Sequence, residues 1–329
     1  MTMLRIASLL LILAATATSQ TIRFATIAPE GSTWMKVLKN FDREVQKRTG
    51  RKVKFKFFAG AIKGDEKTVI KQMKTGSVDG AGFAGLGMGE ISGEARVLDL
   101  PFLLKTDEEV DHLFGKMFNR IAAEFDKKGF VLLGFSEVGF VHIFSRQRID
   151  SLDALRKSKC WTWAEDPVAA TALQKIGANP VPLTLADVFT SLQTGVINTF
   201  YSPPLGAIAM QWFTKVKYFQ TYPMTHSTGG LVMTKSSFNR LSREHQAVLK
   251  KAAKKHMKRL VSMTRRENAE ALEELKKAGL EFIPRPSDAE LKEYEKIGQA
   301  IRDELKGKVF SKEILNEVLT ALAQFRKGA

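Results

Sequence analysis

The residues able to do acid–base or nucleophilic chemistry are few and scattered along this 329-residue chain. The histidines are His112, His142, His226, His245 and His256. None is paired with another at the spacing of a zinc site. The sequence contains no GxSxG, GxxxxGK(S/T), CxxC or HExxH motif, and no nucleophile has an evident base. We therefore predict that the protein is not an enzyme and has no metal or cofactor.

Three weaker signals remain. The run Gly85 to Gly89 (GLGMG) resembles a dinucleotide-binding loop but lacks the third glycine and the later acidic residue. Asp99 is expected to act as a turn residue. His142 and His226 are the histidines expected nearest a cleft, although such histidines are more often packed side chains than bases. A hydrolase acting through His142 stays open as an alternative.

The first 19 residues have the layout of a secretory signal. Arg5 precedes an apolar run from Ile6 to Ala15, and small residues follow at Ala17 and Ser19. No later segment approaches about 18 consecutive apolar residues. We predict that residues 1–19 are a cleaved signal peptide and that the mature protein is periplasmic. Since Cys160 is the only cysteine, no intramolecular disulfide can form.

The formal net charge is +16. An exported protein rarely meets nucleic acid and no nucleic-acid-binding motif is present, so we expect no nucleic-acid partner. Much of the positive charge lies in one helical tract between Lys250 and Arg266. A solvated helix face explains this tract, and a docking surface for a partner is the alternative.

The elements that must position any site alternate between strand and helix. Strands at 21–27, 53–58 and 77–83 are separated by helices at 33–48 and 64–73, and the pattern restarts with strands at 159–163, 179–183 and 196–201. A strand at 229–233 returns to the first sheet, and 243–277 is one long helix. We predict an α/β fold with two lobes and a cleft between them.

Ligands of open α/β sheets bind beyond the carboxyl ends of the strands. The candidate ligand-binding residues at those ends are Trp34, Asp65, Phe83, Phe140, Val141, Trp161, Trp163, Thr184, Asn198 and Tyr201. They are mostly aromatic or uncharged, which favours binding over catalysis.

Five motifs, taken in order, resemble those of the solute-binding subunits of tripartite ATP-independent periplasmic (TRAP) transporters. They are Phe57 to Asp65 (FFAGAIKGD), Leu98 to Phe102 (LDLPF), Gly177 to Leu183 (GANPVPL), Asp187 to Phe189 (DVF) and Leu192 to Gly195 (LQTG). The resemblance implies a periplasmic-binding-protein-like fold with hinge strands, a long helix spanning both lobes, and delivery of the ligand to a membrane permease. It places lobe I at 20–140 plus 225–255 and lobe II at 141–224 plus 256–329.

The departures from the family pattern bear on the ligand. The family usually places arginines where this chain has Val141 and Trp161, and the usual Asp-Gly is Asn198-Thr199. Burying a carboxylate without a cationic partner costs several kcal/mol, on the order of the desolvation penalty. We therefore predict a hydrophobic or weakly polar ligand, with Trp161 and Phe83 as the apolar floor of the site.

The remaining roles follow from residue type. Asn198, Tyr201 and Thr184 are expected to orient the ligand by hydrogen bonds, whereas Trp163 and Phe140 fit a core position equally well. Two alternatives are an organic acid held by non-standard contacts and a docking protein without a ligand. The resemblance also allows a tetratricopeptide-repeat lipoprotein as a partner.

Overall fold

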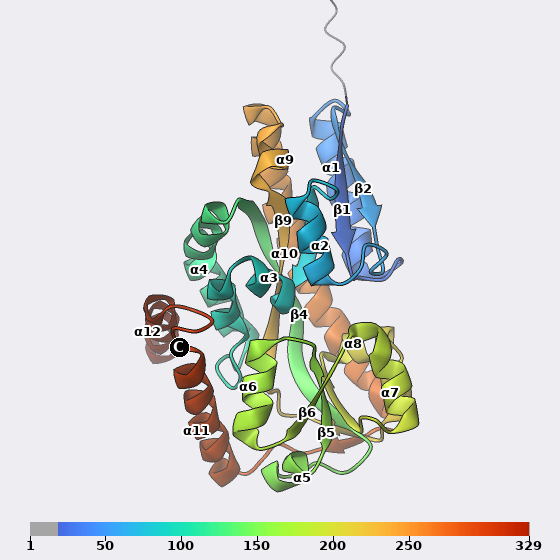
Figure 1. Ribbon diagram of the computed structural model, residues 1–329, viewed down its shortest axis with the longest axis vertical. Helices are drawn as coiled ribbons and strands as arrows, with labels where there is room; N and C mark the ends of the chain where they lie inside the picture. Colours follow the sequence, from blue (N-terminus) through green and yellow to red (C-terminus); the bar gives the residue numbers. More distant parts are fainter. Residues whose placement is uncertain (1–18, 329) are drawn as a thin grey trace, which may run out of the picture.

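The computed structural model describes residues 19–328, so most of the predicted signal peptide (1–19) lies outside the described residues. The strands are β1 (Gln20–Thr26), β2 (Val53–Phe58), β3 (Gly80–Ala84), β4 (Phe130–Ser145), β5 (Lys159–Trp163), β6 (Asn179–Leu183), β7 (Thr199–Ser202), β8 (Tyr218–Gln220), β9 (Thr225–Thr234) and β10 (Glu281–Ile283). Figure 1 shows them in two lobes, one above the other.

Helices cover the faces of both parts of the sheet (Figure 1). They are α1 (Thr33–Arg48), α2 (Glu66–Lys74), α3 (Gly85–Ile91), α4 (Asp107–Lys127), α5 (Leu152–Arg156), α6 (Pro167–Ile176), α7 (Val188–Thr194), α8 (Pro204–Ala209), α9 (Lys235–Asn239), α10 (Arg243–Lys277), α11 (Asp288–Leu305) and α12 (Lys312–Gly328). Short 3₁₀ turns are η1 (Gly93–Asp99), η2 (Leu185–Asp187) and η3 (Trp212–Lys215).

Local signals explain where these helices begin. Ser32, Asp65 and Asp166 each accept a hydrogen bond from a backbone N–H in the first turn of α1, α2 and α6. Gly177 ends α6 in the left-handed conformation that glycine adopts without steric cost. The predicted long helix at 243–277 is confirmed as α10.

The sheet is continuous, in the order β2-β1-β3-β9-β4-β7-β5-β6. The first lobe pairs β1 in parallel with β2 and β3, and the second pairs β5 in parallel with β6 and β7. The antiparallel strands β4 and β9 run between them, and β4 pairs with β9 up to Val141 and with β7 from His142 onward. The predicted two-lobed α/β fold is confirmed.

The crossing between the lobes differs from the sequence prediction. Residues 130–136 and those from 140 onward each have the pattern of a strand, which predicts two strands, whereas β4 is one strand of 16 residues. It stays continuous because its irregularities are absorbed by register shifts at Leu132/Gly134 and Glu137/Gly139. Gly139 has φ 117°, and a Cβ there would lie 2.6 Å from the Asn268 side chain of α10. Asn268 in turn donates to the Val138 carbonyl and accepts from the Leu205 N–H.

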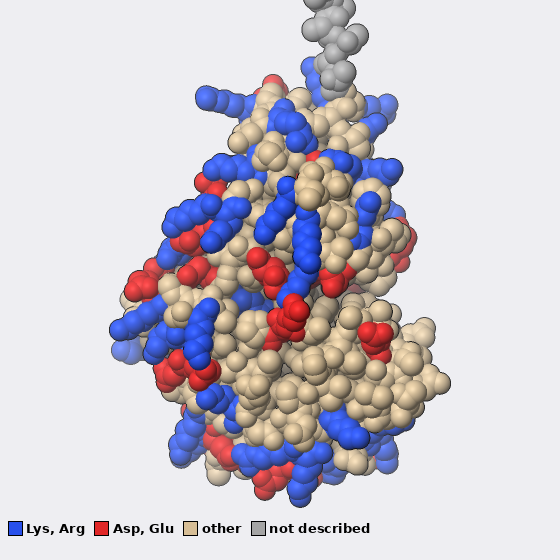
Figure 2. Space-filling model, viewed as in Figure 1, with Lys and Arg blue, Asp and Glu red and all other residues tan. Residues whose placement is uncertain are grey.

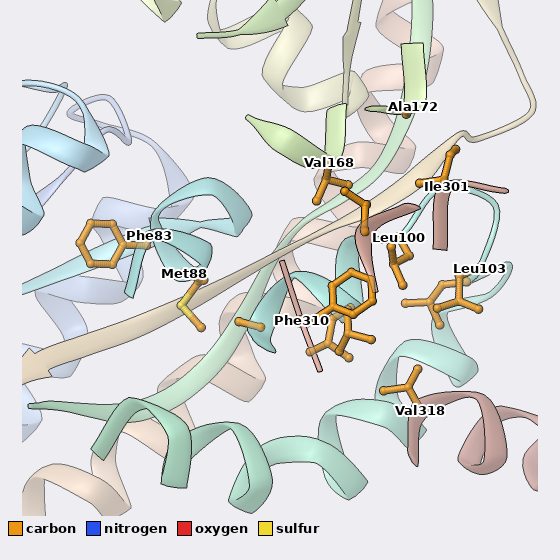
Figure 3. Close-up of a cluster of buried hydrophobic side chains, with 14 of the residues drawn as sticks. Phe83, Met88, Leu100, Leu103, Val168, Ala172, Ile301, Phe310 and Val318 are labelled. Carbon is orange, nitrogen blue, oxygen red and sulfur yellow. The ribbon is translucent and has the colours of Figure 1, made fainter. Parts of the chain in front are cut away.

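The C-terminal helices join the two lobes from outside. α11 packs against α6 of the second lobe, while α12, which the sequence analysis did not predict, packs against α4 and η1 of the first. Figure 3 shows their apolar contacts, with Ile301, Phe310 and Val318 near Leu100 and Leu103. The exact lobe bounds therefore stay a prediction.

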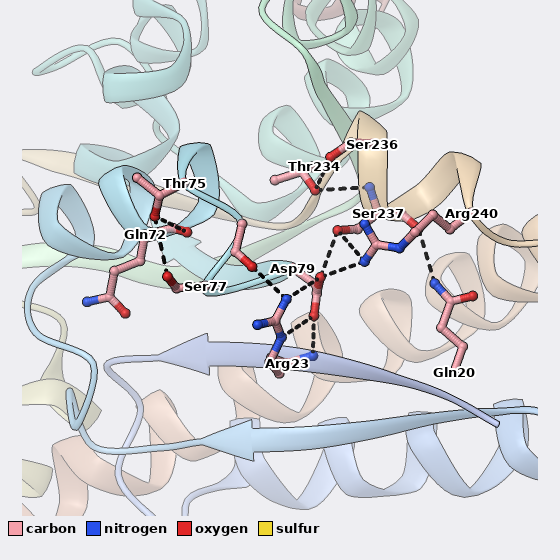
Figure 4. A network of polar contacts seen from close by, with 11 residues as sticks. Gln20, Arg23, Gln72, Thr75, Ser77, Asp79, Thr234, Ser236, Ser237 and Arg240 are labelled. Atoms are coloured by element: carbon pink, nitrogen blue, oxygen red, sulfur yellow. Dashed lines mark hydrogen bonds and ion pairs between the residues drawn. The ribbon is translucent and has the colours of Figure 1, made fainter. Parts of the chain in front are cut away.

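A buried carboxylate ties the outer end of the first lobe together (Figure 4). Asp79 accepts hydrogen bonds from Arg23 of β1, from Ser237 of α9 and from Arg240, the residue that follows α9. Burial alone raises the pKa of Asp79, but these donors outweigh burial and lower the pKa to about 2. The Asp79 cluster, as we call these four residues, thus holds an ionised carboxylate in the core.

Candidate functional site

A cavity of about 220 Å³ lies between the lobes. The first lobe and the β4–β9 crossing contribute Ile27, Ala84, Gly85, Leu86, Arg96, Asp99, Pro101, Val138, Val141, Met224, Thr225, His226 and Ser227. The second lobe contributes Trp161, Trp163, Asp166, Val168, Ala169, Ala172, Leu173, Leu185, Tyr201, Ser202, Pro203, Gly206, Met210 and Trp212. The two walls differ in chemistry.

The wall from the second lobe is aromatic. Trp161 is buried at the centre, stacked on Tyr201 with ring centroids 5.0 Å apart and edge-on to Trp212 at 5.3 Å. Its indole N–H donates to the Leu183 carbonyl at 3.2 Å, so its polar atom is satisfied by the protein. Trp163 lies 5.5 Å from Trp161 and is half-buried. This wall offers a ligand mainly apolar surface.

Tyr201 carries the polar group of that wall. Its hydroxyl oxygen accepts a hydrogen bond from the Trp163 N–H at 3.3 Å. Burial raises the pKa of Tyr201, so the phenol is neutral at physiological pH. Tyr201 therefore adds a hydroxyl but no charge.

The opposite wall holds a buried arginine that the sequence analysis missed. Arg96 of η1 donates to both carboxylate oxygens of Asp166, at 2.8 and 3.0 Å, and pairs with Asp99 at 3.1 Å. All three side chains are less than 10% exposed, at 8%, 7% and 6%. We call these three residues the Arg96 cluster. Arg96 was not among the predicted site residues, and it lies at neither of the two positions, 141 and 161, where the family usually has arginine.

Electrostatics keep Arg96 charged. Burial alone lowers the pKa of Arg96, but the carboxylates of Asp166 and Asp99 outweigh burial and raise it. Burial raises the pKa of Asp99, although Arg96 and the Thr228 N–H oppose the shift. Asp99 is thus part of the cavity wall rather than only a turn residue.

The glycines of the GLGMG run make room for the Arg96 cluster. A Cβ on Gly85 would lie 1.8 Å from an Asp99 oxygen, and one on Gly89 would lie 2.5 Å from Cδ of Arg96. Neither distance is sterically possible without displacing these side chains. The run resembles a dinucleotide loop by composition, but its glycines let a helix approach a buried ion pair.

A second group of polar side chains, His226, Glu137 and Arg265, adjoins the cavity. His226 lines the cavity, and its Nε2 lies 3.2 Å from the Glu137 carboxylate. The same carboxylate accepts a hydrogen bond from Arg265 at 2.8 Å. Among the described residues, Nδ1 of His226 has no hydrogen-bond partner. His142 instead lies outside the cavity lining, with Nδ1 on the Gln220 carbonyl, and burial lowers its pKa to about 4. His142 is therefore neutral at pH 7.

Four of the ten predicted ligand-binding residues line the cavity, namely Val141, Trp161, Trp163 and Tyr201. Of the other aromatic candidates, Phe83 is buried beside Gly87 and helps to build the core in Figure 3. Phe140 packs on His226 at 5.2 Å, and Trp34 packs beside Gly82 and Gly229. Of the two residues expected to form the apolar floor, Trp161 lines the cavity, whereas Phe83 lies in the core of the first lobe.

The polar candidates have local partners. Asp65 caps α2, Thr184 donates to Asp187, and Asn198 accepts from the Lys159 N–H at 2.9 Å and from Thr199. None of the three lines the cavity. Ser202, Thr225 and Ser227 line it instead.

Two further properties of the described residues concern metal binding and membrane spanning. Within residues 19–328, no group of three His, Cys, Asp or Glu side chains is arranged to bind a metal ion. In the same range, no helix has both the length and the apolar character needed to cross a membrane.

Residues 24–308 match the model of the family described as bacterial extracellular solute-binding protein, family 7. The chain belongs to this family. It is a solute-binding protein of the TRAP type, as its sequence motifs predicted. Its fold agrees, because the structure of a sugar acid binding protein from Advenella mimigardefordensis, in complex with galactonate, matches with a TM-score of 0.86 and 24% identity over 93% of this chain and 99% of the other.

Two further similar proteins have named ligands. A TRAP solute-binding protein from Haemophilus influenzae with bound L-gulonate matches with a TM-score of 0.85 and 20% identity, over 92% and 99% of the two chains. The 2,3-diketo-L-gulonate-binding periplasmic protein of Escherichia coli is 26% identical over 293 residues, 87% of each chain. These relatives are receptors that bind small organic acids.

Proposed function

We propose that this solute-binding protein is exported to the periplasm and encloses a small organic solute with a largely apolar body. Hinge closure of the two lobes traps the solute, which is then handed to a TRAP membrane permease. The family membership supports the receptor role and the permease partner. The nature of the solute rests on the cavity.

The single observation that carries the ligand class is the composition of the cavity walls. Trp161, Trp163, Tyr201 and Trp212 form one side. Among the described residues that line the cavity, Arg96 is the one Lys or Arg side chain, and it is already paired with two carboxylates. Burying apolar ligand surface here is favourable by about 25 cal/mol per Å². A smaller apolar cavity of roughly 150 Å³ can bind benzene. The volume thus suits a ring or short chain with a small polar group.

An organic acid is the second candidate. The acids named for the three relatives favour it, and an entirely hydrophobic ligand has no support among them. In this chain Val141 and Trp161 line the cavity without charge, so the acid would need Arg96, His226 or the hydroxyls of Ser202 and Thr225.

Two measurements separate these candidates. Solvent extraction of the purified protein, followed by mass spectrometry, should release a molecule that is mostly apolar. Titration calorimetry with L-gulonate and D-galactonate should give no binding tighter than the millimolar range. Micromolar binding of either sugar acid would replace the first candidate by the second.

The aromatic wall can be tested with a matched pair of variants. Trp163→Ala should weaken binding of the extracted ligand about tenfold, since an aromatic side chain buries 150–250 Å² when fully covered and Trp163 is only partly buried. Trp34→Ala is the control, because Trp34 is also half-buried but lies outside the cavity lining. Equal losses in both variants would show that the cavity is not the binding site.

The remaining partners stay proposals. The basic tract of α10 is partly used internally, since Lys255 pairs with Glu44 and Arg265 with Glu137 and Asp111. In Figure 2, Lys and Arg side chains cover much of the upper lobe, whereas the middle of the lower lobe is largely uncharged on this face. A tetratricopeptide-repeat lipoprotein rests on the resemblance alone.

A further inference from the structure

The strongest unexplained feature of the cavity is the pairing of Arg96 with Asp166. Arg96 belongs to η1, which packs against α3, α4 and α12 in the first lobe. Asp166 precedes α6 in the second lobe and uses both oxygens to accept from the Arg96 Nη2. The ion pair therefore crosses the cleft at the wall of the ligand cavity.

A guanidinium is the side chain best suited to bind a ligand carboxylate. It presents five N–H donors in a planar fork that matches two carboxylate oxygens. In this protein Asp166 takes Nη2 and Asp99 pairs with Nη1. Among the described residues, the remaining Nε has no hydrogen-bond partner. The arginine is thus present in the cavity but its two terminal nitrogens are occupied.

The two carboxylates also oppose an anionic ligand by charge. One guanidinium faces Asp99 and Asp166, so the cluster has a net negative formal charge when both are ionised. In a buried site this repulsion is poorly screened. A ligand carboxylate would have to displace an oxygen of Asp166 and lie close to both aspartates.

We propose that Asp166 is a specificity-determining residue, an internal carboxylate that occupies Arg96 and excludes ligand carboxylates. The proposal rests on the proposed function, since it explains how a cavity that contains an arginine selects a solute without a carboxylate. It assigns the selectivity to one residue of the second lobe. Replacing that residue should convert the cavity into a carboxylate site.

Two substitutions free Arg96 while keeping α6 capped. Asp166 also accepts from the Val168 and Ala169 N–H groups, and Asn and Ser serve this capping role as well as Asp does. Asp166→Asn removes the charge at nearly constant shape. In Asp166→Asn the amide oxygen could still accept a hydrogen bond from Arg96. Asp166→Ser shortens the side chain as well, so it should release the guanidinium in that case too.

The matched control is Glu165→Gln. Glu165 is the adjacent residue, pairs with Lys67 across the same cleft and loses the same charge when substituted. Its side chain is 77% exposed and does not line the cavity. An effect of net charge or of lobe closure alone would therefore appear in both variants, whereas exposure of Arg96 would appear only at position 166.

The experiment compares benzoate with benzamide by titration calorimetry, because the two probes differ in charge but hardly in size. The native protein and Glu165→Gln should bind benzoate no more tightly than benzamide. Asp166→Asn or Asp166→Ser should shift this preference toward benzoate by roughly 10- to 100-fold, the worth of a hydrogen bond to a charged group.

The outcomes are distinct from those that test the proposed function. An unchanged benzoate preference in both Asp166 variants, or no benzoate binding up to the millimolar range, overturns the role of Asp166. The extracted ligand can still be apolar in that case. Conversely, tight binding of sugar acids by the native protein overturns the apolar-solute proposal, whatever the Asp166 variants do.

Discussion

The Asp79 cluster and the Arg96 cluster each pair one buried charge with two opposite charges, but the sign of the central charge is reversed between them. In the first, one carboxylate that is 1% exposed is shared by two arginines that are 40% and 55% exposed. In the second, one arginine is shared by two carboxylates and all three are buried. The arginines of the first cluster reach solvent, whereas all three side chains of the second are buried. Function is expected at the second because its charges meet a cavity.

The largest effect should come from Arg96→Met. This change leaves Asp99 and Asp166 buried without a cation, and removal of one partner of a buried pair costs about 3–5 kcal/mol. Urea unfolding should show this loss in the free energy of unfolding. The matched triple variant Arg96→Met, Asp99→Asn, Asp166→Asn should recover part of it. A loss below about 1 kcal/mol for Arg96→Met would show that the cavity hydrates the cluster.

Asp79→Asn should cost less, about 2 kcal/mol. The two arginines left behind can turn toward water, so the loss is confined to hydrogen bonds with a charged acceptor. The same urea experiment measures it. A cost equal to that of Arg96→Met would remove the distinction between the two clusters.

The Asp79 cluster should also make the free energy of unfolding fall at acidic pH. Since the folded pKa of Asp79 is about 2 and the unfolded value is 3.8, its contribution to stability is complete above about pH 5 and is lost progressively as the pH falls toward 2. The shift corresponds to about 2 kcal/mol. Glu44, whose pKa is also lowered to about 2 by Lys255, His256 and Arg48 despite partial burial, adds to the same window.

Unfolding measured from pH 6 to pH 3 in the native protein and in Asp79→Asn tests this assignment. The gap between the two proteins should narrow as the pH falls. A gap that stays constant would mean that Asp79 has the same pKa in the folded and the unfolded protein.

The smallest effect should come from Glu165→Gln. The Lys67–Glu165 pair crosses the cleft like the Arg96–Asp166 pair, but Glu165 is exposed, and such pairs contribute about 0–1 kcal/mol. The melting temperature should change by no more than a few degrees and respond to salt. A larger, salt-insensitive change would indicate that the exposed pair is as important as the buried one.

The sequence predicted the elements better than it predicted the cavity. Periodicity and capping residues located α10 and the alternating strands, because those signals are local. Trp161, Trp163, Tyr201 and Val141 were predicted at strand ends and line the cavity. By contrast, η1 and α6 are far apart in sequence, and only the tertiary fold brings Arg96 to Asp166.

A local trace of that pairing does exist in the sequence. Gly85 and Gly89 lie four positions apart, one turn of helix, and both face the Arg96 cluster. Read as a phosphate loop, the run was weak evidence of a nucleotide. Read as a helix face without side chains, the same two glycines indicate that a large side chain from another element packs against this face. The sequence alone does not say which side chain it is.

The crossing by β4 and β9 has a mechanical consequence. Two paired strands, backed by Asn268 of α10, carry the chain from one lobe to the other with no intervening loop. We expect this ladder to bend at its register shifts, next to Gly134 and Gly139, where the regular pairing is interrupted. The lobes should then open mainly along one bending direction, which those few residues define.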